Sequence, residues 1–318
     1  MRNCLVTGGA GVIGSFLVNR IYNDYNVRII DDLSSGEISH ISDLITKTRI
    51  SFKKGSVISI DDVIEIMKGC DVVFHLAANG DVRYRPEKSN DIDLKINTLG
   101  TYNVLEAMRK LDVANIIFSS TSSVYGLASK IPTSEDYGPL FPESLYGSSK
   151  LAAESLISAY SSMYGIKATI LRFANIVAPI SRTIGKNVIP DFIDKLKISP
   201  DKLLILGDGN QTKSYLYVDD CIDGMLYLSA KQTRNVDIFN LGTVDTISVN
   251  EIADIIMEEM HLPSSRKEYT GGKVGWIGDI PLTFLDITKA RKMGWTPRHN
   301  SAESVRLSAR GLLNRLTF

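Results

Sequence analysis

The sequence has few of the residues that would indicate an extracellular, metal-dependent or nucleic-acid-binding protein. Its 318 residues include only 3 cysteines and 4 histidines, and none of them stand at metal-ligand spacing. We therefore expect reduced thiols and no metal site. The 36 Lys and Arg residues are balanced by 36 Asp and Glu, so the chain lacks the basic character of nucleic-acid-binding proteins. It also has no HExxH or GxSxG pattern, which argues against zinc hydrolysis and serine esterase chemistry.

Long apolar segments are missing as well. No uncharged apolar run reaches the roughly 20 residues of a membrane span. The N-terminus enters a glycine-rich segment almost at once, which predicts that there is no signal peptide. We therefore expect a cytoplasmic protein with neither membrane nor nucleic acid partners. A chain of 318 residues, 44% hydrophobic and 23% charged, is long enough for one large or two medium domains.

Glycine is plentiful near the start of the chain and has a regular spacing there. Apolar residues at 4–7 lead into Gly8, Gly11 and Gly14, and an amphipathic stretch follows at 15–22. This pattern predicts a strand, a tight turn and a helix. Glycine lets the backbone approach a pyrophosphate closely, and the free N–H groups at the helix N-terminus can then bind the anion.

An acidic residue follows at the distance that a dinucleotide-binding fold requires. The second apolar run, 27–30, ends in Asp31, which lies 20 residues after Gly11. A carboxylate at this place accepts hydrogen bonds from the adenosine ribose hydroxyls. It also repels a 2′-phosphate, so we predict NAD rather than NADP as the cofactor. An ordinary strand-to-helix turn would explain the glycines alone, but not this spacing.

Strands and helices alternate along the first 175 residues, which is typical of an α/β protein with a doubly wound parallel sheet, the Rossmann fold. We expect residues 1–175 plus about 214–245 to form this NAD-binding domain. Segments are shorter and richer in Gly and Pro at about 176–213 plus 246–318, which predicts a smaller, discontinuous C-terminal substrate-binding lobe. Further strands are predicted at 50–53, 71–78, 116–121, 168–172 and 236–241, and further helices at 61–69, 92–111, 146–164, from 218 and at 249–260.

Tyr146 and Lys150 are the strongest candidates for chemistry. They lie four residues apart at the start of a predicted helix, so their side chains share a face. A tyrosine with a pKa of about 10 is a poor base, but a nearby ammonium and the positive nicotinamide ring of NAD⁺ would lower that pKa. Tyr146 could then accept a proton from a sugar hydroxyl while a hydride passes to NAD⁺. Thr121, at the end of a predicted strand, could orient the same hydroxyl. His75 follows a buried strand, so we expect it to have a packing or cofactor-facing role.

Several longer motifs occur in a fixed order along nearly the whole chain. They are TGGAGVIG at 7–14, DDLSSG at 31–36, HLAA at 75–78, SSTSSVYG at 119–126, YGSSK at 146–150, LRFAN at 171–175, LGDGNQTKSYLYVDD at 206–220 and FNLG at 239–242. With them the sequence resembles the extended short-chain dehydrogenase/reductase (NAD-dependent epimerase/dehydratase) family, and within it the UDP-glucose 4-epimerases. The resemblance implies NAD-dependent epimerisation at C4 of a UDP-hexose through a transient 4-keto sugar.

The resemblance also implies roles for individual residues. It implies a homodimer formed through a four-helix bundle of residues 92–111 and 146–164. The implied catalytic set is Thr121, Tyr146 and Lys150. The implied cofactor-binding residues are Gly8, Gly11, Val12, Ile13, Gly14, Asp31, Asp32, Leu33, Ser35, Gly36, Leu76, Ala77, Ala78, Asn97, Ser119, Tyr146 and Lys150. The implied substrate-binding residues are Thr121, Ser122, Ser123, Asn175, Asn187, Val188, Lys213 and Thr283.

The chain departs from the family pattern at a few positions. Ser56 stands where relatives often have an Asp near the adenine, and Ala178 replaces a glycine. Lys213 replaces an arginine that meets the diphosphate, so it keeps the charge but loses the bidentate fork. A second phosphate-binding arginine aligns with Trp276, and Lys273 is a candidate to replace it.

Two positions bear on the choice of reaction. Related dehydratases and decarboxylases place acidic residues after the catalytic threonine, whereas this chain has Ser122 and Ser123, so we favour epimerisation. Thr283 is small for a residue of the sugar pocket, which predicts that N-acetylated UDP-hexoses also fit; a neighbour, Leu282 or Phe284, could face the pocket instead. UDP-glucuronate 4-epimerase or dehydrogenase activity remains an alternative, as do an alcohol dehydrogenase that releases NADH and a non-catalytic NAD-sensing protein.

Overall fold

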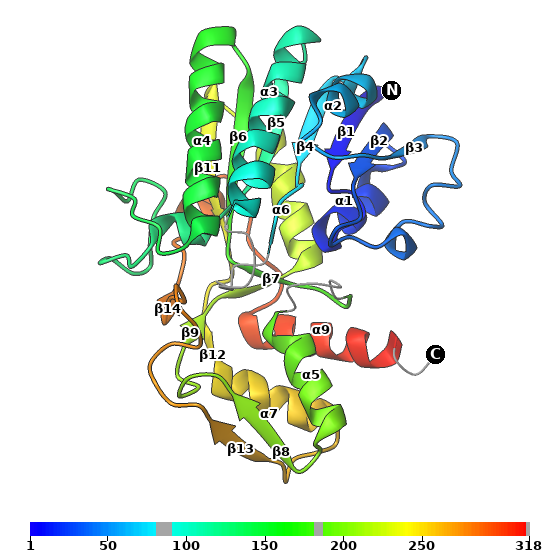
Figure 1. Ribbon diagram of the computed structural model, residues 1–318. Coiled ribbons are helices and arrows are strands. Elements are labelled where there is room, and N and C mark those ends of the chain that lie inside the picture. The colour runs from blue at the N-terminus through cyan, green and yellow to red at the C-terminus, as the bar shows by residue number, and fades with distance from the viewer. Residues whose placement is uncertain (81–90, 181–186, 316–318) are drawn as a thin grey trace.

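The computed structural model describes residues 1–80, 91–180 and 187–315. A seven-stranded parallel sheet lies at its centre, with the strand order β11-β6-β5-β4-β1-β2-β3 (Figure 1). This order confirms the predicted doubly wound, Rossmann-like α/β fold. The strands are β1 (Arg2–Thr7), β2 (Tyr25–Asp31), β3 (Ile50–Lys54), β4 (Val72–His75), β5 (Asn115–Thr121), β6 (Lys167–Phe173) and β11 (Val236–Leu241).

Helices cover both faces of this sheet. Side chains alternate along β1, so that Cys4 and Val6 pack into the core on one face and Leu5 packs into the core on the other. Because both faces are buried, the central strands are nearly continuous apolar runs in the sequence. One face carries α1 (Val12–Ile21) and α6 (Val218–Ala230), and the other carries α2 (Ile60–Met67), α3 (Gly100–Lys110) and α4 (Leu145–Tyr164).

The strand order reverses at β1 and β4, which are neighbours in the sheet. In open α/β sheets the ligand crevice lies outside the carboxyl ends of the strands at such a point. Strand β1 ends at Thr7, β4 at His75 and β5 at Thr121. The fold therefore places the glycine-rich turn, the HLAA segment and the predicted catalytic threonine along one edge of the sheet.

Helix α4 begins and ends where the sequence provides caps. The Ser144 hydroxyl accepts a hydrogen bond from the Gly147 N–H at 3.1 Å. Gly165 follows the last residue with a φ of 73°, a conformation that glycine adopts without strain. The predicted helix at 146–164 is thus confirmed, and its buried face includes Lys150 and Glu154.

The predicted helix at 92–111 is not uniform. Residues Leu94–Leu99 form a π-helical turn (η2), and the α-helical part begins only at Gly100. A π turn shifts the phase of the helix, so one apolar period does not describe the whole segment. The turn carries Asn97, whose side chain is buried.

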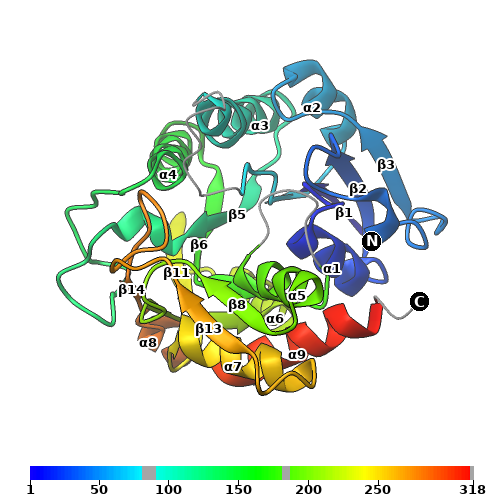
Figure 2. The same ribbon diagram turned by 60° about the horizontal axis from the view of Figure 1, so that its bottom comes forward.

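A smaller group of elements with its own apolar core lies below the sheet in the view of Figure 1. The predicted helix at 249–260 is present there as α7, whereas the sequence did not predict α5 or α9. Figure 2 shows α5, α7 and α9 near the strand pair β8–β13. The elements are α5 (Val188–Ile198), β8 (Lys202–Ile205), β9 (Thr212–Lys213), β12 (Ile247–Ser248), α7 (Val249–Glu259), β13 (Arg266–Tyr269), β14 (Leu282–Thr283) and α9 (Ser301–Arg315).

Two short strands mark where the chain passes between the two parts. Strand β7 (Asn175–Val177) pairs with β10 (Tyr215–Tyr217), close to the expected boundaries at 175 and 214. Leu285 and Trp295, on either side of α8 (Thr288–Lys292), pack into the core beside the sheet. We propose a division into two domains as predicted, with one change: the segment around α8, which the sequence prediction places in the smaller lobe as part of 246–318, is assigned to the NAD-binding domain.

Some absences can be stated for the described residues. In 1–80, 91–180 and 187–315 no helix is both long and apolar enough to cross a membrane. Over the same ranges no group of three or more His, Cys, Asp and Glu residues is arranged to hold a metal ion. Cys4, Cys70 and Cys221 are buried free thiols.

Candidate active site

One continuous pocket runs along the carboxyl edge of the sheet and reaches the smaller lobe. It is lined by almost all the residues predicted to bind cofactor or substrate; Leu33 and Asn97 are not among its lining residues. The predicted residues that line it are Gly8, Gly11, Val12, Ile13, Gly14, Asp31, Asp32, Ser35, Gly36, Leu76, Ala77, Ala78, Ser119, Thr121, Ser122, Ser123, Tyr146, Lys150, Asn175, Asn187, Val188, Lys213 and Thr283.

The glycine-rich turn leaves no room for side chains. Gly8 has a φ of 71°, and its N–H donates to the carbonyl of Ile30 at 2.8 Å. A Cβ on Gly14 would lie 2.1 Å from the Gly8 carbonyl oxygen. Gly11 caps α1 without a side chain, so no side-chain cap competes for the first N–H groups of the helix. This cradle fits the pyrophosphate of a dinucleotide.

Asp31 is fixed at the other side of the turn. Its carboxylate accepts hydrogen bonds from the N–H groups of Ala10 and Leu33, both at 2.9 Å. Burial raises the pKa of Asp31, and these N–H groups act against that shift. Leu33 has a φ of 61°, and its N–H is one of the two that hold the carboxylate. The acidic group that we predicted for the adenosine ribose is therefore held in the pocket wall, and Leu33 supports it.

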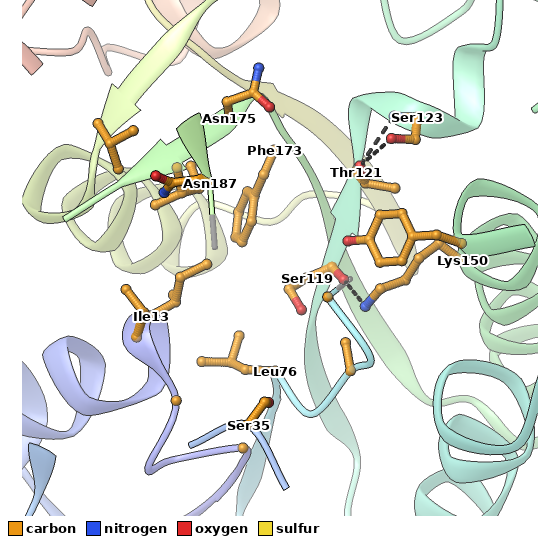
Figure 3. Close-up of a pocket in the computed structure, with 18 of the residues that line it drawn as sticks. Ile13, Ser35, Leu76, Ser119, Thr121, Ser123, Lys150, Phe173, Asn175 and Asn187 are labelled. Carbon is orange, nitrogen blue, oxygen red and sulfur yellow. Dashed lines mark hydrogen bonds between the residues drawn. The ribbon is translucent and has the colours of Figure 1, made fainter. Parts of the chain in front are cut away.

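Lys150 is the buried cation of the site. Its Nζ donates to the carbonyl of Ser119 at 2.7 Å (Figure 3). It also lies 4.7 Å from the centre of the Phe118 ring. Burial lowers the pKa of Lys150 to about 7, and the carboxylates of Glu154 and Asp93 act against that shift. Tyr146, one helical turn earlier on α4, also lines the pocket.

Thr121 ends β5 and caps the short 3-10 turn η3 (Ser122–Tyr125). Its hydroxyl oxygen accepts from the Ser123 N–H at 3.1 Å, and the two hydroxyls are 3.2 Å apart (Figure 3). These contacts fix the rotamer of Thr121 at the pocket surface. With Ser122, three consecutive hydroxyl residues therefore line the same pocket as Tyr146.

His75 has a packing role, as expected from its strand. Thr7 Oγ1 accepts from the N–H groups of Leu76 and Ala77, so its own proton goes to His75 Nδ1 at 2.7 Å. His75 Nε2 then donates to Thr101 Oγ1 at 3.0 Å. Burial lowers the pKa of His75 to about 3, so the ring is neutral and ties β1 and β4 to α3.

Asn97 lies behind the pocket wall. Its Nδ2 donates to the Ser149 hydroxyl at 2.9 Å, and its Oδ1 accepts from the N–H of Asn79 at 2.9 Å. It therefore links α4 to the segment after β4. A direct contact of Asn97 with the cofactor stays a prediction.

The phosphate-binding candidate Lys213 has an acidic partner. Its Nζ lies 2.5 Å from Asp279 Oδ1 and 5.2 Å from the centre of the Trp276 ring. The second oxygen of Asp279 accepts from the Gly275 N–H at 3.0 Å. Asp279 and Trp276 also line the pocket. Sequence reasoning placed Lys213 there but missed its pairing with Asp279, because the two residues are 66 positions apart.

Other predicted residues reach the pocket from short elements. Asn187 caps α5, with its side chain accepting from the Ile189 N–H, and Asn175 donates from its side chain to the Ser214 carbonyl. Figure 3 shows Phe173, which was not predicted, pointing into the same space. Of the three neighbours considered for the sugar pocket, Thr283 lines it, whereas Leu282 and Phe284 are not among its lining residues.

Gln211 is a second pocket residue that sequence reasoning missed. Its Nε2 donates to the Leu206 carbonyl at 3.2 Å. In the described part of the chain, its Oε1 is the one buried side-chain polar atom without a partner. A buried acceptor without a donor is costly, so we expect a water, or a ligand after a local shift of the side chain, to donate there. Its position two residues before Lys213, within the motif at 206–220, was the available signal.

The departures from the family pattern lie as follows. Ser56 lines the pocket, and Asp62 accepts from its N–H at 3.3 Å. Lys273 is exposed and is not among the lining residues, so its replacement of an arginine stays a hypothesis. Ala178 is buried and accepts from the Ser308 hydroxyl through its carbonyl.

Comparisons with known proteins agree with this geometry. Residues 4–242 match the NAD dependent epimerase/dehydratase family. The chain belongs to this family. It is 30% identical over 306 residues to a UDP-glucose 4-epimerase of Mycolicibacterium smegmatis, an alignment that covers 95% of each chain. NAD is therefore its cofactor, and the chain is an enzyme of the UDP-sugar epimerase/dehydratase kind.

Solved structures of similar proteins support the same assignment. The UDP-glucose 4-epimerase of Thermotoga maritima, solved with UDP-glucose, is 30% identical with a TM-score of 0.87 and 99% of each chain covered. The UDP-glucuronic acid 4-epimerase of Bacillus cereus, solved with UDP-glucuronic acid and NAD, is 28% identical with a TM-score of 0.88, covering 98% of this chain and 99% of the other.

Proposed function

We propose that this enzyme interconverts the C4 epimers of a UDP-hexose, UDP-glucose and UDP-galactose first of all. The observation that carries the proposal is the convergence of Thr121, Tyr146 and Lys150 in one pocket. The glycine-rich turn and Asp31 line one part of that pocket, and residues of the smaller lobe line another. A cofactor and a sugar nucleotide bound at these two parts would meet at the three catalytic residues.

Bound NAD supplies the hydride acceptor and donor for the reaction. The Lys150 ammonium and the cofactor's positive charge stabilise the Tyr146 phenolate, which takes the proton from the C4 hydroxyl. Thr121 orients that hydroxyl. The 4-keto sugar then rotates, Tyr146 returns the proton, and the hydride returns to the opposite face of C4.

The smaller lobe holds the nucleotide in this proposal. The α5 N-terminus at Asn187 and Val188 offers N–H groups to the diphosphate, and Lys213 offers a charge after exchanging Asp279 for phosphate. Gln211 Oε1 is buried, so a hydrogen-bond donor of the ligand would reach it only after a local shift of the side chain.

Ser122 and Ser123 favour epimerisation over elimination. An acid that would protonate a leaving hydroxyl is missing at these two positions, which carry hydroxyl groups instead.

The hydroxyls of Ser122 and Ser123 also favour a second candidate substrate, UDP-glucuronate, because they can donate to a carboxylate on C5 of the sugar. The fold similarity to the Bacillus cereus enzyme is consistent with this alternative.

Thr283 bears on the C2 substituent of the sugar. It lies at the end of β14, opposite Lys213 in β9, and lines the pocket with a small side chain. Bulk at this point would crowd an acetamido group, so we propose that the enzyme also accepts N-acetylated UDP-hexoses.

We also propose that two copies associate through α3 and α4. Leu99, the last residue of η2, and Tyr102 on α3 are 42% and 41% exposed. Helix α4 beside them exposes small residues, Ser148, Ser155 and Ala159. Small side chains allow close helix approach around such apolar residues.

Substitution of the base tests the mechanism. Tyr146→Phe should lower kcat about 100-fold or more, because only the proton acceptor is lost. Affinity for NAD and the melting temperature should stay near those of the parent. Tyr137→Phe, outside the pocket lining, is the control and should keep its rate. Turnover by Tyr146→Phe at the parental rate would refute the assignment.

A further inference from the structure

Glu154 is a buried acidic residue that the proposed mechanism does not use. It lies on α4 one turn after Lys150 and is 5% exposed. Its Oε1 accepts from the Ser120 hydroxyl at 2.5 Å and from Arg172 Nε at 3.0 Å, and its Oε2 accepts from Arg172 Nη2 at 2.7 Å. These partners of the carboxylate, Ser120 and Arg172, belong to β5 and β6.

Arg172 completes a buried ion pair. Its side chain is 4% exposed, and the pair with Glu154 is bidentate, the strongest geometry for these two groups. The guanidinium also donates to the Glu135 carbonyl at 3.3 Å and lies 4.7 Å from the centre of the Tyr125 ring. Burying two charges costs desolvation, so such a pair gives little net stability compared with apolar side chains. We therefore look for the role of this ion pair in the positions of the elements that it joins, α4, β5 and β6.

The pair sits where geometry matters most for the reaction. Lys150 Nζ is bound to the carbonyl of Ser119, and Glu154 is bound to the hydroxyl of Ser120. Helix α4 is therefore attached to two consecutive residues of β5, and the next residue is Thr121. A shift of α4 along β5 would break both contacts and change the spacing between Tyr146 and Thr121.

We propose that Glu154 is a positioning residue that, with Arg172, locks α4 to the ends of β5 and β6 and so sets the geometry of Tyr146, Lys150 and Thr121. The catalytic part of this inference rests on the proposed function. The positioning of Lys150 does not rest on the proposed function. Lys150 also lines the pocket where the cofactor is expected, so its placement can be measured through the affinity for NAD.

Glu154→Gln tests the proposal, since it keeps the shape but turns an amide N–H₂ toward Arg172. With the UDP-hexose that the parent epimerises, kcat should fall about 10- to 100-fold, as expected for a catalytic group displaced by around 1 Å. KM should change less than about threefold, because the substrate contacts in the lobe are untouched. The Kd for NAD, measured by titration calorimetry, should rise about fivefold or more.

Glu259→Gln is the matched control. Glu259 also forms a bidentate pair, with Arg310 at 2.8 and 3.0 Å, and accepts from Arg306 as well; it lies in the smaller lobe and outside the pocket lining, and the Arg310 side chain is 58% exposed. The Glu259→Gln variant should have a lower melting temperature than the parent and an unchanged kcat and affinity for NAD. If Glu154→Gln behaves in the same way, Glu154 is only a stabilising residue and the proposal is wrong.

The remaining outcomes are also decisive. If the parent epimerises no UDP-hexose, the proposed function fails, whereas an increased Kd for NAD in Glu154→Gln still supports the positioning of Lys150. If Glu154→Gln does not fold, Glu154→Asp replaces it: the charge is kept, but the carboxylate is one methylene short of Arg172. A parental kcat and NAD affinity in Glu154→Asp would overturn the proposal.

Discussion

At the residue scale, the site depends on one buried cation. Lys150 is 1% exposed, and the Ser119 carbonyl, the Phe118 ring and the nearby carboxylates of Glu154 and Asp93 are what support its charge. With a pKa of about 7, the ammonium is partly deprotonated near neutral pH before cofactor binds. The lysine therefore responds to small changes in its surroundings.

This depressed pKa has a consequence for stability. Between about pH 7 and 10.5, the unfolded chain binds a proton on Lys150 that the folded chain does not. The contribution of Lys150 to the free energy of unfolding therefore rises with pH across that window, by at most about 1.4 kcal/mol per unit. The free energies of unfolding of the parent and of Lys150→Met, measured with urea and without cofactor, test this. The value of the parent minus that of the variant should rise with pH between about pH 7 and 10.5.

Lys110→Met, at an exposed position on α3, is the control and should show no comparable change with pH. A difference between the parent and Lys150→Met that is the same throughout the window would mean that Lys150 is not buried as described.

Residues with a strong local signal were predictable. Gly8, Asp31 and Tyr146 belong to short motifs whose spacing reflects local geometry, and the structure brings them to one pocket. The pairs Lys213–Asp279 and Glu154–Arg172 join residues that are distant in sequence. A single sequence carries no direct sign of such pairs, so the acidic partners were missed.

At the element scale, long periodic segments were predicted best. Helix α4 and strands β5 and β11 lie within a residue or two of their expected ranges. The helix at 92–111 was predicted without its π turn, because hydrophobic spacing does not reveal a shift of one residue. Helices α5 and α9 were not predicted; in the structure α5 packs on α7 and α9, and α9 packs on β10 and α7.

The pairing of α3 and α4 between two copies is testable at this scale. Leu99→Glu places a charge in the proposed interface, where it would have to be desolvated. Sedimentation velocity should show a dimer for the parent and a shift toward monomer for the variant. Ile198→Glu, at an 86% exposed position at the end of α5, should sediment like the parent. A Leu99→Glu protein that remains as dimeric as the parent would show that the interface lies elsewhere.

At the scale of the whole molecule, two differently built parts share one pocket. The parallel sheet and its flanking helices supply the glycine-rich turn, Asp31 and the proposed catalytic residues, and the smaller lobe supplies Lys213 and Asn187. The fold class and the cofactor followed from sequence because they depend on local motifs in a fixed order. The sugar did not, because residues that we propose for its contacts, Lys213 and Thr283, lie in the short strands β9 and β14, which the sequence did not predict.

The most direct test of the account follows the hydrogen on C4 of the sugar. The enzyme is incubated in D₂O with UDP-glucose, UDP-galactose, their N-acetylated forms or UDP-glucuronate, and the products are analysed by NMR. We predict C4 epimers that carry protium at C4, because the hydride leaves and returns within the bound cofactor and never exchanges with water. No epimer from any of these sugars, or deuterium at C4 of the product, would contradict the account.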